Sequence, residues 1–379
     1  MSTGAQLRLA GAACDTCPAR FGRCVPPEPA AAAAKLAVVG EGPGRNELEQ
    51  GRPFIGASGR MLARGLKTLG LSRADVHWTN AVLCDCKLEE QPKARVACAQ
   101  RLRAELAACE APVVMPVGAL GLHSAMALPR KPQILKWRGS VSKLTYPTEP
   151  GAEAQSAYVL PTIHPAFVMR APKWGPVLEI DVTRVGRVLR DGFTAPEDAP
   201  QRRLLIPRTR ESLREALASL RGDEPSFDVE TVGLGPSYTA LVCYGLSDGL
   251  TTVVVPWSKA SNGIEPFWRD GGREAVELTN AVLSRRRAVT HNGPAFDHIV
   301  AARYGIRIEA WEDTLLGAHA LSGHMPKNLA HVVTLYLDVP PWKQLEDRGA
   351  DIERLWIYNG RDCLYTALAR KAQRKELRA

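Results

Sequence analysis

Two carboxylates, Asp228 and Glu230, stand two positions apart within the stretch 226–231, which otherwise alternates with apolar residues. If this stretch forms a strand, both side chains lie on one face, because side-chain direction alternates along a strand. Two carboxylates on one face are able to hold a divalent metal ion, although surface strands also carry alternating acids that bind nothing. Two acidic segments that follow in the sequence strengthen the prediction of a metal site.

The first of these segments is 290–297, where an apolar run ends in a Gly-Pro turn and a helical pattern begins at His298. Asp297 therefore lies at the start of a predicted helix, where aspartate is also common as an ordinary N-cap. The second is 358–362, in a stretch that continues with helical periodicity. Its spacing of four places Tyr358 and Asp362 on one helix face, as an amphipathic surface helix would also do.

Together these segments resemble the exonuclease motifs of the proofreading domain of DNA polymerase I and its relatives, the 3′-to-5′ exonucleases with four acidic residues and a tyrosine. The resemblance runs from about residue 203 to the end and includes 313–316 and 327–330. It implies a ribonuclease H-like fold with two Mg²⁺ or Mn²⁺ ions. It also implies a role for five residues: Asp228, Glu230 and Asp362 at the first ion, Asp228 and Asp297 at the second, and Tyr358 orienting the attacking water.

Phosphodiester hydrolysis explains why these residue types occur together. Two metal ions about 4 Å apart stabilise both the attacking and the leaving oxygen, and Mg²⁺ and Mn²⁺ prefer carboxylate oxygens. Four acids packed together repel one another unless cations neutralise them. We therefore expect a two-ion centre in the second half of the chain.

Length and composition set limits on the whole chain. Its 379 residues suffice for two domains, and 45% hydrophobic with 23% charged residues is globular rather than disordered. The net charge of +9 is consistent with a polyanionic partner such as DNA. No apolar run is long enough to span a bilayer, and the N-terminus lacks a secretion signal, so we expect no membrane association and a cytoplasmic protein.

The N-terminal half of the chain has glycine-rich turns that follow a predicted strand. Residues 35–40 read as a buried strand, which runs into the turn 40–44 and is followed by the stretch 51–59. Taken together, these resemble family 4 uracil-DNA glycosylases, the iron-sulfur members of that superfamily, and 80–84, 113–118 and 162–167 match as well. The resemblance covers about residues 10–192. It implies a three-layer α/β/α sandwich with a parallel sheet, whose ligand-binding turns lie at the carboxyl ends of the strands.

The glycosylase resemblance implies a role for five residues. A base must leave the stack before it is cut from its sugar, and Phe54 would stack on the flipped uracil. The Asn80 amide can meet the O4 acceptor and the N3 donor of uracil, whereas cytosine presents the opposite pattern. His164 would donate to O2 of the departing base. Glu41 and the backbone of Gly42 would form the pocket floor, and Glu41 would also act in catalysis by positioning the water. Three of these residues have an ordinary alternative: Phe54 as a core aromatic, Asn80 as a strand-end cap and His164 as a turn histidine.

Nine cysteines in a cytosolic protein favour metal or cluster ligation over disulfides, and seven lie in the first third of the chain. Four match the ligand positions of the iron-sulfur glycosylases: Cys14, Cys17, Cys84 and Cys98. Four thiolates suit a 4Fe-4S cluster, and zinc is the main alternative. The neighbouring Cys24, Cys86 and Cys109 are expected to be small buried hydrophobes.

These observations divide the chain into a glycosylase-like domain (1–192), a proline-containing linker (193–203) and an exonuclease domain (204–379). We expect the latter to begin with a strand at 204–206 and a helix at 211–220, and to continue with antiparallel strands at 241–246 and 252–255. Only seventeen residues follow Asp362, too few for a polymerase domain.

The expected function is that of a DNA-processing enzyme that acts on single-stranded DNA or a frayed 3′ end, with a separately encoded polymerase as a candidate partner. In the alternative, the front half is a non-catalytic module that binds DNA or a partner protein.

Overall fold

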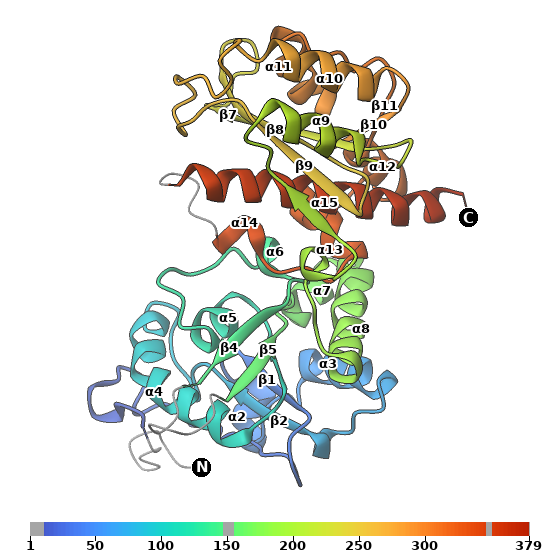
Figure 1. Cartoon of the computed structure of the whole chain (residues 1–379). Coiled ribbons are helices and arrows are strands. Elements are labelled where there is room, and N and C mark those ends of the chain that lie inside the picture. Colours follow the sequence, from blue (N-terminus) through green and yellow to red (C-terminus); the bar gives the residue numbers. More distant parts are fainter. Residues whose placement is uncertain (1–10, 147–154, 346–350, 379) are drawn as a thin grey trace. The chain divides into compact units, whose positions relative to one another are not determined.

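The computed structural model describes residues 11–146, 155–345 and 351–378 (Figure 1). The chain divides into two compact units, Met1–Phe193 (unit 1) and Thr194–Ala379 (unit 2). Each unit contains one β-sheet and several helices. The prediction of two α/β domains is thereby confirmed.

Unit 1 is built on a five-stranded sheet with the order β2-β1-β3-β5-β4. Its strands are β1 (Leu36–Gly40), β2 (Val76–Asn80), β3 (Val113–Pro116), β4 (Ser142–Thr145) and β5 (Ser156–Val159). The first four strands in spatial order are parallel, as predicted, but β4 pairs antiparallel with β5 at the edge. Ten residues separate β4 from β5, and a parallel crossover generally needs a dozen or more.

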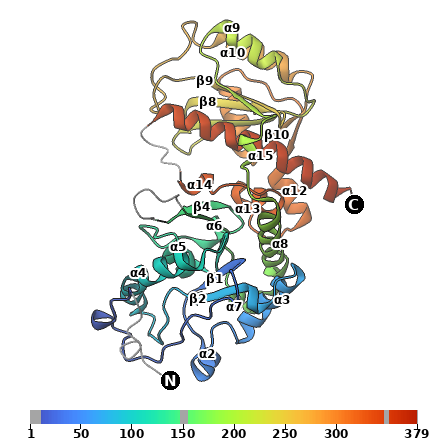
Figure 2. The same ribbon diagram turned by 60° about the horizontal axis from the view of Figure 1, so that its bottom comes forward.

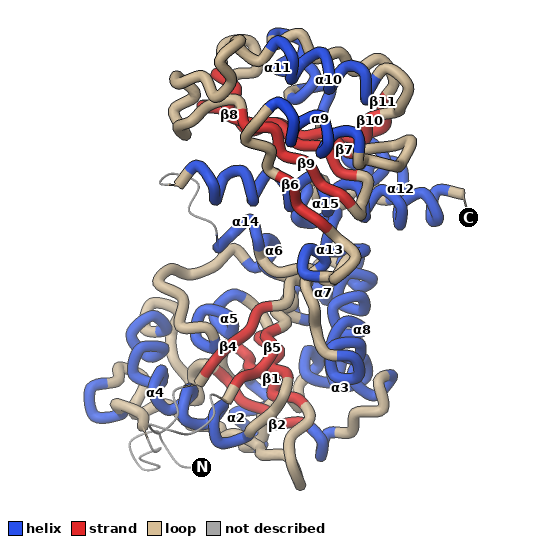
Figure 3. Tube along the Cα trace, viewed as in Figure 1, coloured by secondary structure: helices blue, strands red, loops and turns tan. Residues whose placement is uncertain are grey.

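Helices lie on both faces of this sheet (Figures 1 and 3). The apolar side chains of β1 are buried on both sides, and Ala37 and Val39 pack in one core cluster with Leu102 and Leu122. Those two residues belong to α4 and α5, while α3 and α8 lie on the opposite side of the sheet. The helices of unit 1 are α2 (Arg45–Gln50), α3 (Ala57–Thr68), α4 (Gln91–Cys109), α5 (Ala119–Ala125), α6 (Ile134–Trp137), α7 (Pro165–Arg170) and α8 (Gly175–Asp191).

Unit 2 is built on a six-stranded mixed sheet with the order β11-β10-β7-β8-β9-β6. Its strands are β6 (Arg203–Leu205), β7 (Ser226–Val232), β8 (Ala240–Ser247), β9 (Thr251–Pro256), β10 (Ala288–Thr290) and β11 (Trp311–Asp313). Strands β7, β8 and β9 are antiparallel neighbours, which confirms the predicted antiparallel pair. Strand β10 runs parallel to β7 and β11.

Helices cover both faces of the second sheet as well (Figures 1 and 2). One core cluster joins Phe227 and Leu246 to α9, α10 and α11, and another joins Val242 to α13 and α15. The helices of unit 2 are α9 (Arg210–Ala218), α10 (Arg273–Leu283), α11 (Asp297–Arg303), α12 (Thr314–Leu321), α13 (Leu329–Tyr336), α14 (Trp342–Leu345) and α15 (Ile352–Leu377).

The predicted linker is structured over part of its length. A short 3-10 helix, η4 (Pro196–Asp198), lies within it. The Glu197 carboxylate accepts a hydrogen bond of 2.5 Å from the Tyr365 hydroxyl and pairs with Arg361 at 3.0 Å. These contacts fasten the stretch to α15, so it is part of unit 2 and not an open connection.

No helix in the described part of the chain combines the length and apolarity that crossing a bilayer requires.

Candidate active sites

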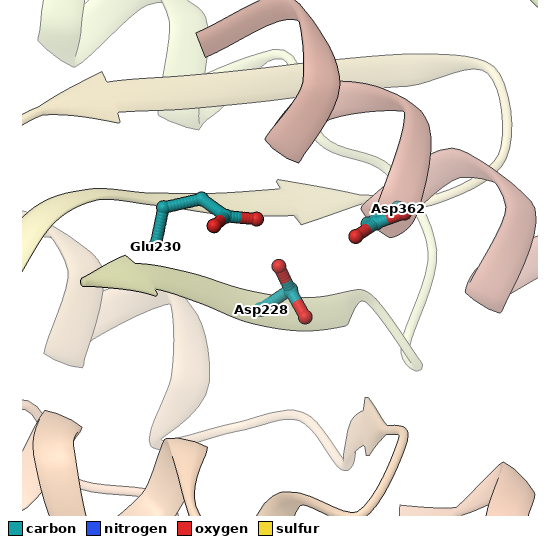
Figure 4. A group of neighbouring side chains, drawn as sticks. All are labelled: Asp228, Glu230 and Asp362. Carbon is teal, nitrogen blue, oxygen red and sulfur yellow. The ribbon is translucent and has the colours of Figure 1, made fainter. Parts of the chain in front are cut away.

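Strand β7 presents its carboxylates to the face of the sheet that α15 covers. Phe227 and Val229 belong to the core cluster on the opposite side, so the alternation of the strand turns Asp228 and Glu230 toward α15. Asp362 of α15 meets them there, and one ligand oxygen from each residue lies within 4.8 Å of the other two. Figure 4 shows the three carboxylates turned toward one another.

A glycine lets α15 approach this part of the sheet closely. Gly245 of β8 stands opposite Asp228, and a Cβ there would overlap the Asn359 amide oxygen and lie 2.7 Å from Cys363 Sγ. Because that space is free, Asn359 Nδ2 reaches across and donates a hydrogen bond of 2.8 Å to Asp228 Oδ2. The helix thus both supplies one carboxylate and orients another.

The negative charges of the acidic residues repel one another. Burial raises the pKa of Asp228 well above its usual range, and the charges of Asp297, Asp362 and Glu230 raise it further. Carboxylates packed so closely are favoured when cations neutralise them. Within the described part of the chain, Asp228, Glu230 and Asp362 form the one group of His, Cys, Asp or Glu side chains in which three ligand atoms all lie within 4.8 Å of one another.

The fourth predicted acid, Asp297, lies beside the group. It is the first residue of α11, and its Oδ1 accepts a hydrogen bond of 3.0 Å from the backbone N–H of Val229. Burial raises its pKa to about 7. Asp297 thus contacts β7 between the two strand carboxylates, but it does not belong to the set of oxygens within 4.8 Å of one another.

Tyr358 and two residues that the sequence reasoning missed complete this region. Tyr358 is 2% exposed, and its hydroxyl accepts a hydrogen bond of 2.6 Å from Lys343 Nζ. The same ammonium donates to Asp362 Oδ2 at 2.5 Å, and Trp342 Nε1 donates to Asp362 Oδ1 at 2.6 Å. The only local signal was the Pro-Pro-Trp-Lys run at 340–343, which has no spacing relation to the acidic segments.

Unit 1 has a cavity of about 360 Å³ beside the carboxyl ends of β1 and β2. Four residues predicted to bind or act on uracil line it: Gly42, Phe54, Asn80 and His164. The parallel pairing of β1 with β2 places Gly40 opposite Asn80, so the turn after β1 lies next to the Asn80 side chain. Arg45 and Asn46 also line the cavity.

Phe54 is held in an unusual backbone conformation. Its φ of 56° lies in the left-handed region, which bulky residues seldom adopt. Arg73 donates to the preceding carbonyl of Pro53 at 2.5 Å, and Glu28 in turn accepts two hydrogen bonds from Arg73. The Phe54 ring packs 5.1 Å from that of Trp78. Strain at one aromatic residue, sustained by its surroundings, is typical of a binding site.

Asn80 lies at the end of β2 and is 3% exposed. Arg101 Nη2 donates to its backbone carbonyl at 2.8 Å, which fixes the strand end without using the side-chain amide. A Cβ at Gly40 would overlap Asn80 Oδ1 and lie 2.7 Å from Phe54 Cζ. Glycine at position 40 is therefore what allows Asn80 and Phe54 to face the same space.

His164 is the N-cap of α7, and its Nδ1 accepts a hydrogen bond of 3.1 Å from the Ala166 N–H. Burial lowers the pKa of His164, and the charge of Glu41 opposes that shift. A neutral imidazole that accepts at Nδ1 carries its proton on Nε2. The geometry therefore makes His164 a neutral donor through Nε2.

A buried ion pair supports the segment that carries His164. Asp181 of α8 is bonded to Arg138, and both are at most 2% exposed. The Thr162 hydroxyl donates to Asp181 Oδ2 at 2.9 Å. Because Thr162 precedes His164 by two residues, this bond anchors the loop that carries His164 to the core of unit 1.

Two glutamates lie near the cavity: Glu41, which the sequence analysis predicted, and Glu47, which it did not. Glu41 Oε1 accepts a hydrogen bond of 2.9 Å from the Leu120 N–H in the first turn of α5, and Glu41 is not among the residues that line the cavity. Glu47 does line it, and its Oε1 accepts from the Gly56 N–H at 2.7 Å. Glu47 lies three residues after Gly44, the N-cap of α2, and no motif in the sequence marked it.

The four cysteines predicted as ligands come together from three parts of unit 1. Cys14 begins the 3-10 helix η1 (Cys14–Thr16), Cys17 follows it, Cys98 lies on α4, and Cys84 follows β2. Burial raises the pKa of Cys17, and the thiols of Cys98, Cys84 and Cys14 add to this effect. Cys24 lies next to Cys84, which lowers the Cys24 pKa through a hydrogen bond.

Comparisons with solved structures return several nucleases at low similarity. Escherichia coli RNase D, described as an exoribonuclease involved in structured RNA processing, is 19% identical, with a TM-score of 0.35 over 47% of this chain and 45% of that one. Brucella melitensis NrnC with bound Mg²⁺ is 18% identical, with a TM-score of 0.33 over 46% of this chain and 80% of that one.

The sequence comparisons are closer and concern unit 1. Residues 26–180 match the family model of the uracil DNA glycosylase superfamily. The type-4 uracil-DNA glycosylase of Pyrobaculum aerophilum is 33% identical over 173 residues, 42% of this chain and 81% of that protein. That of Sulfurisphaera tokodaii is 32% identical over 162 residues, 40% of this chain and 69% of that protein. Through unit 1, the chain therefore belongs to the uracil DNA glycosylase superfamily, alongside its type-4 members.

Proposed function

We propose that unit 2 is a metal-dependent 3′-to-5′ exonuclease that hydrolyses phosphodiester bonds at the 3′ end of DNA. The observation that carries this proposal is the convergence of Asp228, Glu230 and Asp362, whose ligand oxygens lie within 4.8 Å of one another. An all-oxygen donor set suits Mg²⁺ or Mn²⁺. When bound, two such ions neutralise charge on the attacking and leaving oxygens.

Each residue of the acidic site has a proposed role in binding the ions or in orienting a reacting group. In this proposal Asp228, Glu230 and Asp362 hold the first ion, and Asp228 with Asp297 holds the second. Asn359 keeps the Asp228 carboxylate in one orientation through its hydrogen bond of 2.8 Å. Tyr358 orients the attacking water.

For unit 1 we propose removal of uracil from DNA. The cavity supports this, because it is lined by an aromatic ring, an amide and a histidine. Phe54 stacks on the extruded base, and the Asn80 amide pairs with O4 and N3 of uracil. The neutral His164 donates from Nε2 to O2 as negative charge builds on the leaving base. Gly42 lends its backbone to the cavity, and Glu41 fixes the adjoining turn to α5.

We further propose that Cys14, Cys17, Cys84 and Cys98 hold a 4Fe-4S cluster. Tetrahedral zinc with four thiolates would require sulfur atoms about 3.8 Å apart. Thiolates are also the ligands of a 4Fe-4S cluster, which the similarity to the type-4 uracil-DNA glycosylases favours. It would serve a structural role in joining η1 to α4.

We propose that the glycosylase-like domain (1–192) and the exonuclease domain (204–379) form one DNA-processing enzyme of the cytoplasm. Its substrate is single-stranded DNA or a frayed 3′ end, and a separately encoded polymerase is its candidate partner. The competing proposal is that unit 1 is a non-catalytic module that binds DNA or that partner. Arg45 and Asn46 line the cavity. Replacing both residues would test whether they contribute to the binding of DNA and not to the release of the base.

One experiment tests both activities. Oligonucleotides labelled at the 3′ end, with and without one uracil, are incubated with the full-length protein in Mg²⁺ and in chelator. We expect labelled mononucleotides only with Mg²⁺, and an abasic site at the uracil position in chelator. Asp228→Ala should remove only the first product, and Asn80→Ala only the second.

The outcomes separate the proposals. Absence of 3′ shortening in Mg²⁺ and in Mn²⁺ rejects the exonuclease. Binding of the uracil strand without base release in chelator rejects the glycosylase and favours the module.

A further inference from the structure

Lys343 contacts two residues of the acidic site, Asp362 and Tyr358, although nothing in the sequence pattern links it to the acidic segments. Its ammonium donates to Asp362 Oδ2 at 2.5 Å and to the Tyr358 hydroxyl at 2.6 Å. It also lies 4.7 Å from the centre of the Tyr358 ring. The Lys343 side chain is 21% exposed and that of Asp362 is 4% exposed, so the ion pair is largely shielded from water.

The neighbouring residue fixes the other side of the same carboxylate. Trp342 Nε1 donates to Asp362 Oδ1 at 2.6 Å, and the Trp342 ring packs against Tyr365 with centroids 4.7 Å apart. Both oxygens of Asp362 therefore have a donor from α14. Each carboxylate oxygen can accept a second interaction, so Asp362 is still able to serve as a metal ligand.

Charge places Lys343 in competition with any cation on the acidic group. A divalent ion bound by Asp228, Glu230 and Asp362 shares a carboxylate with the ammonium, and like charges at such separations oppose each other. The hydrogen bond to Tyr358 has a different consequence. It restrains the hydroxyl that the proposed hydrolysis uses to orient water, and such restraint favours turnover.

We propose that Lys343 is a positioning residue with two opposed effects: it weakens the binding of divalent ions to the acidic group, and it holds Tyr358 in place for the reaction. This inference rests on the proposed exonuclease function of the same site. It distinguishes Lys343 from a purely structural lysine, whose loss would impair metal binding and turnover together.

The test compares Lys343→Met, which keeps the length of the side chain but removes its charge, with Lys343→Arg, which keeps the charge. Binding of Mn²⁺ to the full-length protein is measured by titration calorimetry without DNA, with Asp228→Asn to subtract binding elsewhere. Turnover is measured on 3′-labelled DNA at saturating Mn²⁺. Lys259→Met is the matched control, since Lys259 is exposed and lies in the same unit.

We expect Lys343→Met to bind Mn²⁺ about tenfold more tightly than wild type, and yet to turn over at least tenfold more slowly at saturating Mn²⁺. Lys343→Arg should return both values toward wild type, and Lys259→Met should change neither. Hydrogen exchange in α15 confirms that each variant is folded.

Unchanged or weaker Mn²⁺ binding by a folded Lys343→Met protein would overturn the competition, and unchanged turnover would overturn the positioning of Tyr358. If neither wild type nor the folded Lys343→Met protein binds Mn²⁺, the exonuclease proposal itself is rejected. The two failures are therefore distinguishable.

Discussion

Asp297 gives the sharpest test of the acidic site, because its protonation links stability to pH. Burial raises its pKa from 3.8 to about 7. Between these values the folded protein retains a proton that the unfolded chain has already released. Stability must therefore fall as the pH rises from about 4 to about 7, by the linkage between proton binding and folding.

The substitution Asp297→Asn removes this titration while keeping an oxygen that can accept from the Val229 N–H. A pKa raised from 3.8 to about 7 corresponds to about 4 kcal/mol at most. The buried amide nitrogen of asparagine costs part of this gain. In chelator at pH 8 we expect the variant to be more stable than wild type by about 2–3 kcal/mol. At pH 4, where folded wild type keeps the Asp297 proton, only the cost of the buried amide remains, and we expect the variant to be less stable by about 1–2 kcal/mol.

The measurement is pulse proteolysis in urea, with detection of peptides from β7 and α11 so that only unit 2 is followed. Added Mg²⁺ should stabilise wild type, because a ligand that binds only the folded state raises its stability. It should stabilise Asp297→Asn less. Asp223→Asn, an exposed carboxylate just before β7, controls for the change in net charge. A variant less stable than wild type in chelator at pH 8 would refute the reasoning.

Three further predictions concern unit 1. Gly40→Ala should abolish base release from uracil-containing DNA, since the added Cβ overlaps Asn80 Oδ1; exonuclease activity on uracil-free DNA should persist, and retained base release would contradict the assigned cavity. Asp181→Ala should destabilise unit 1 by about 3–5 kcal/mol in urea unfolding, because it removes the carboxylate that pairs with the buried Arg138 and Arg184; a loss below about 1 kcal/mol would show that the ion pairs are not structural. Cys98→Ser should lower bound iron, measured by elemental analysis, whereas the more distant Cys109→Ser should not.

The local periodicity of strands and helices was sufficient to predict which residues of the acidic site share a face. The alternation of β7 places Asp228 and Glu230 on one face, and a spacing of four places Tyr358 and Asp362 on one face of α15. Both patterns depend only on neighbouring residues in the chain. The cysteine ligands and the residues that line the cavity of unit 1 came from a family resemblance, since no period connects Phe54 to Asn80 or His164.

The sequence by itself thus determined which faces carry chemistry, because strand and helix periods are properties of the local backbone. Only the tertiary structure decided which faces meet. Asn359 bonds to Asp228 across 131 positions, Lys343 reaches Asp362 from a separate helix, and Glu47 lines the cavity where Glu41 was expected. Such contacts depend on how closely elements pack, as at Gly245 and Gly40, and that distance is set by the whole core and not by any one segment.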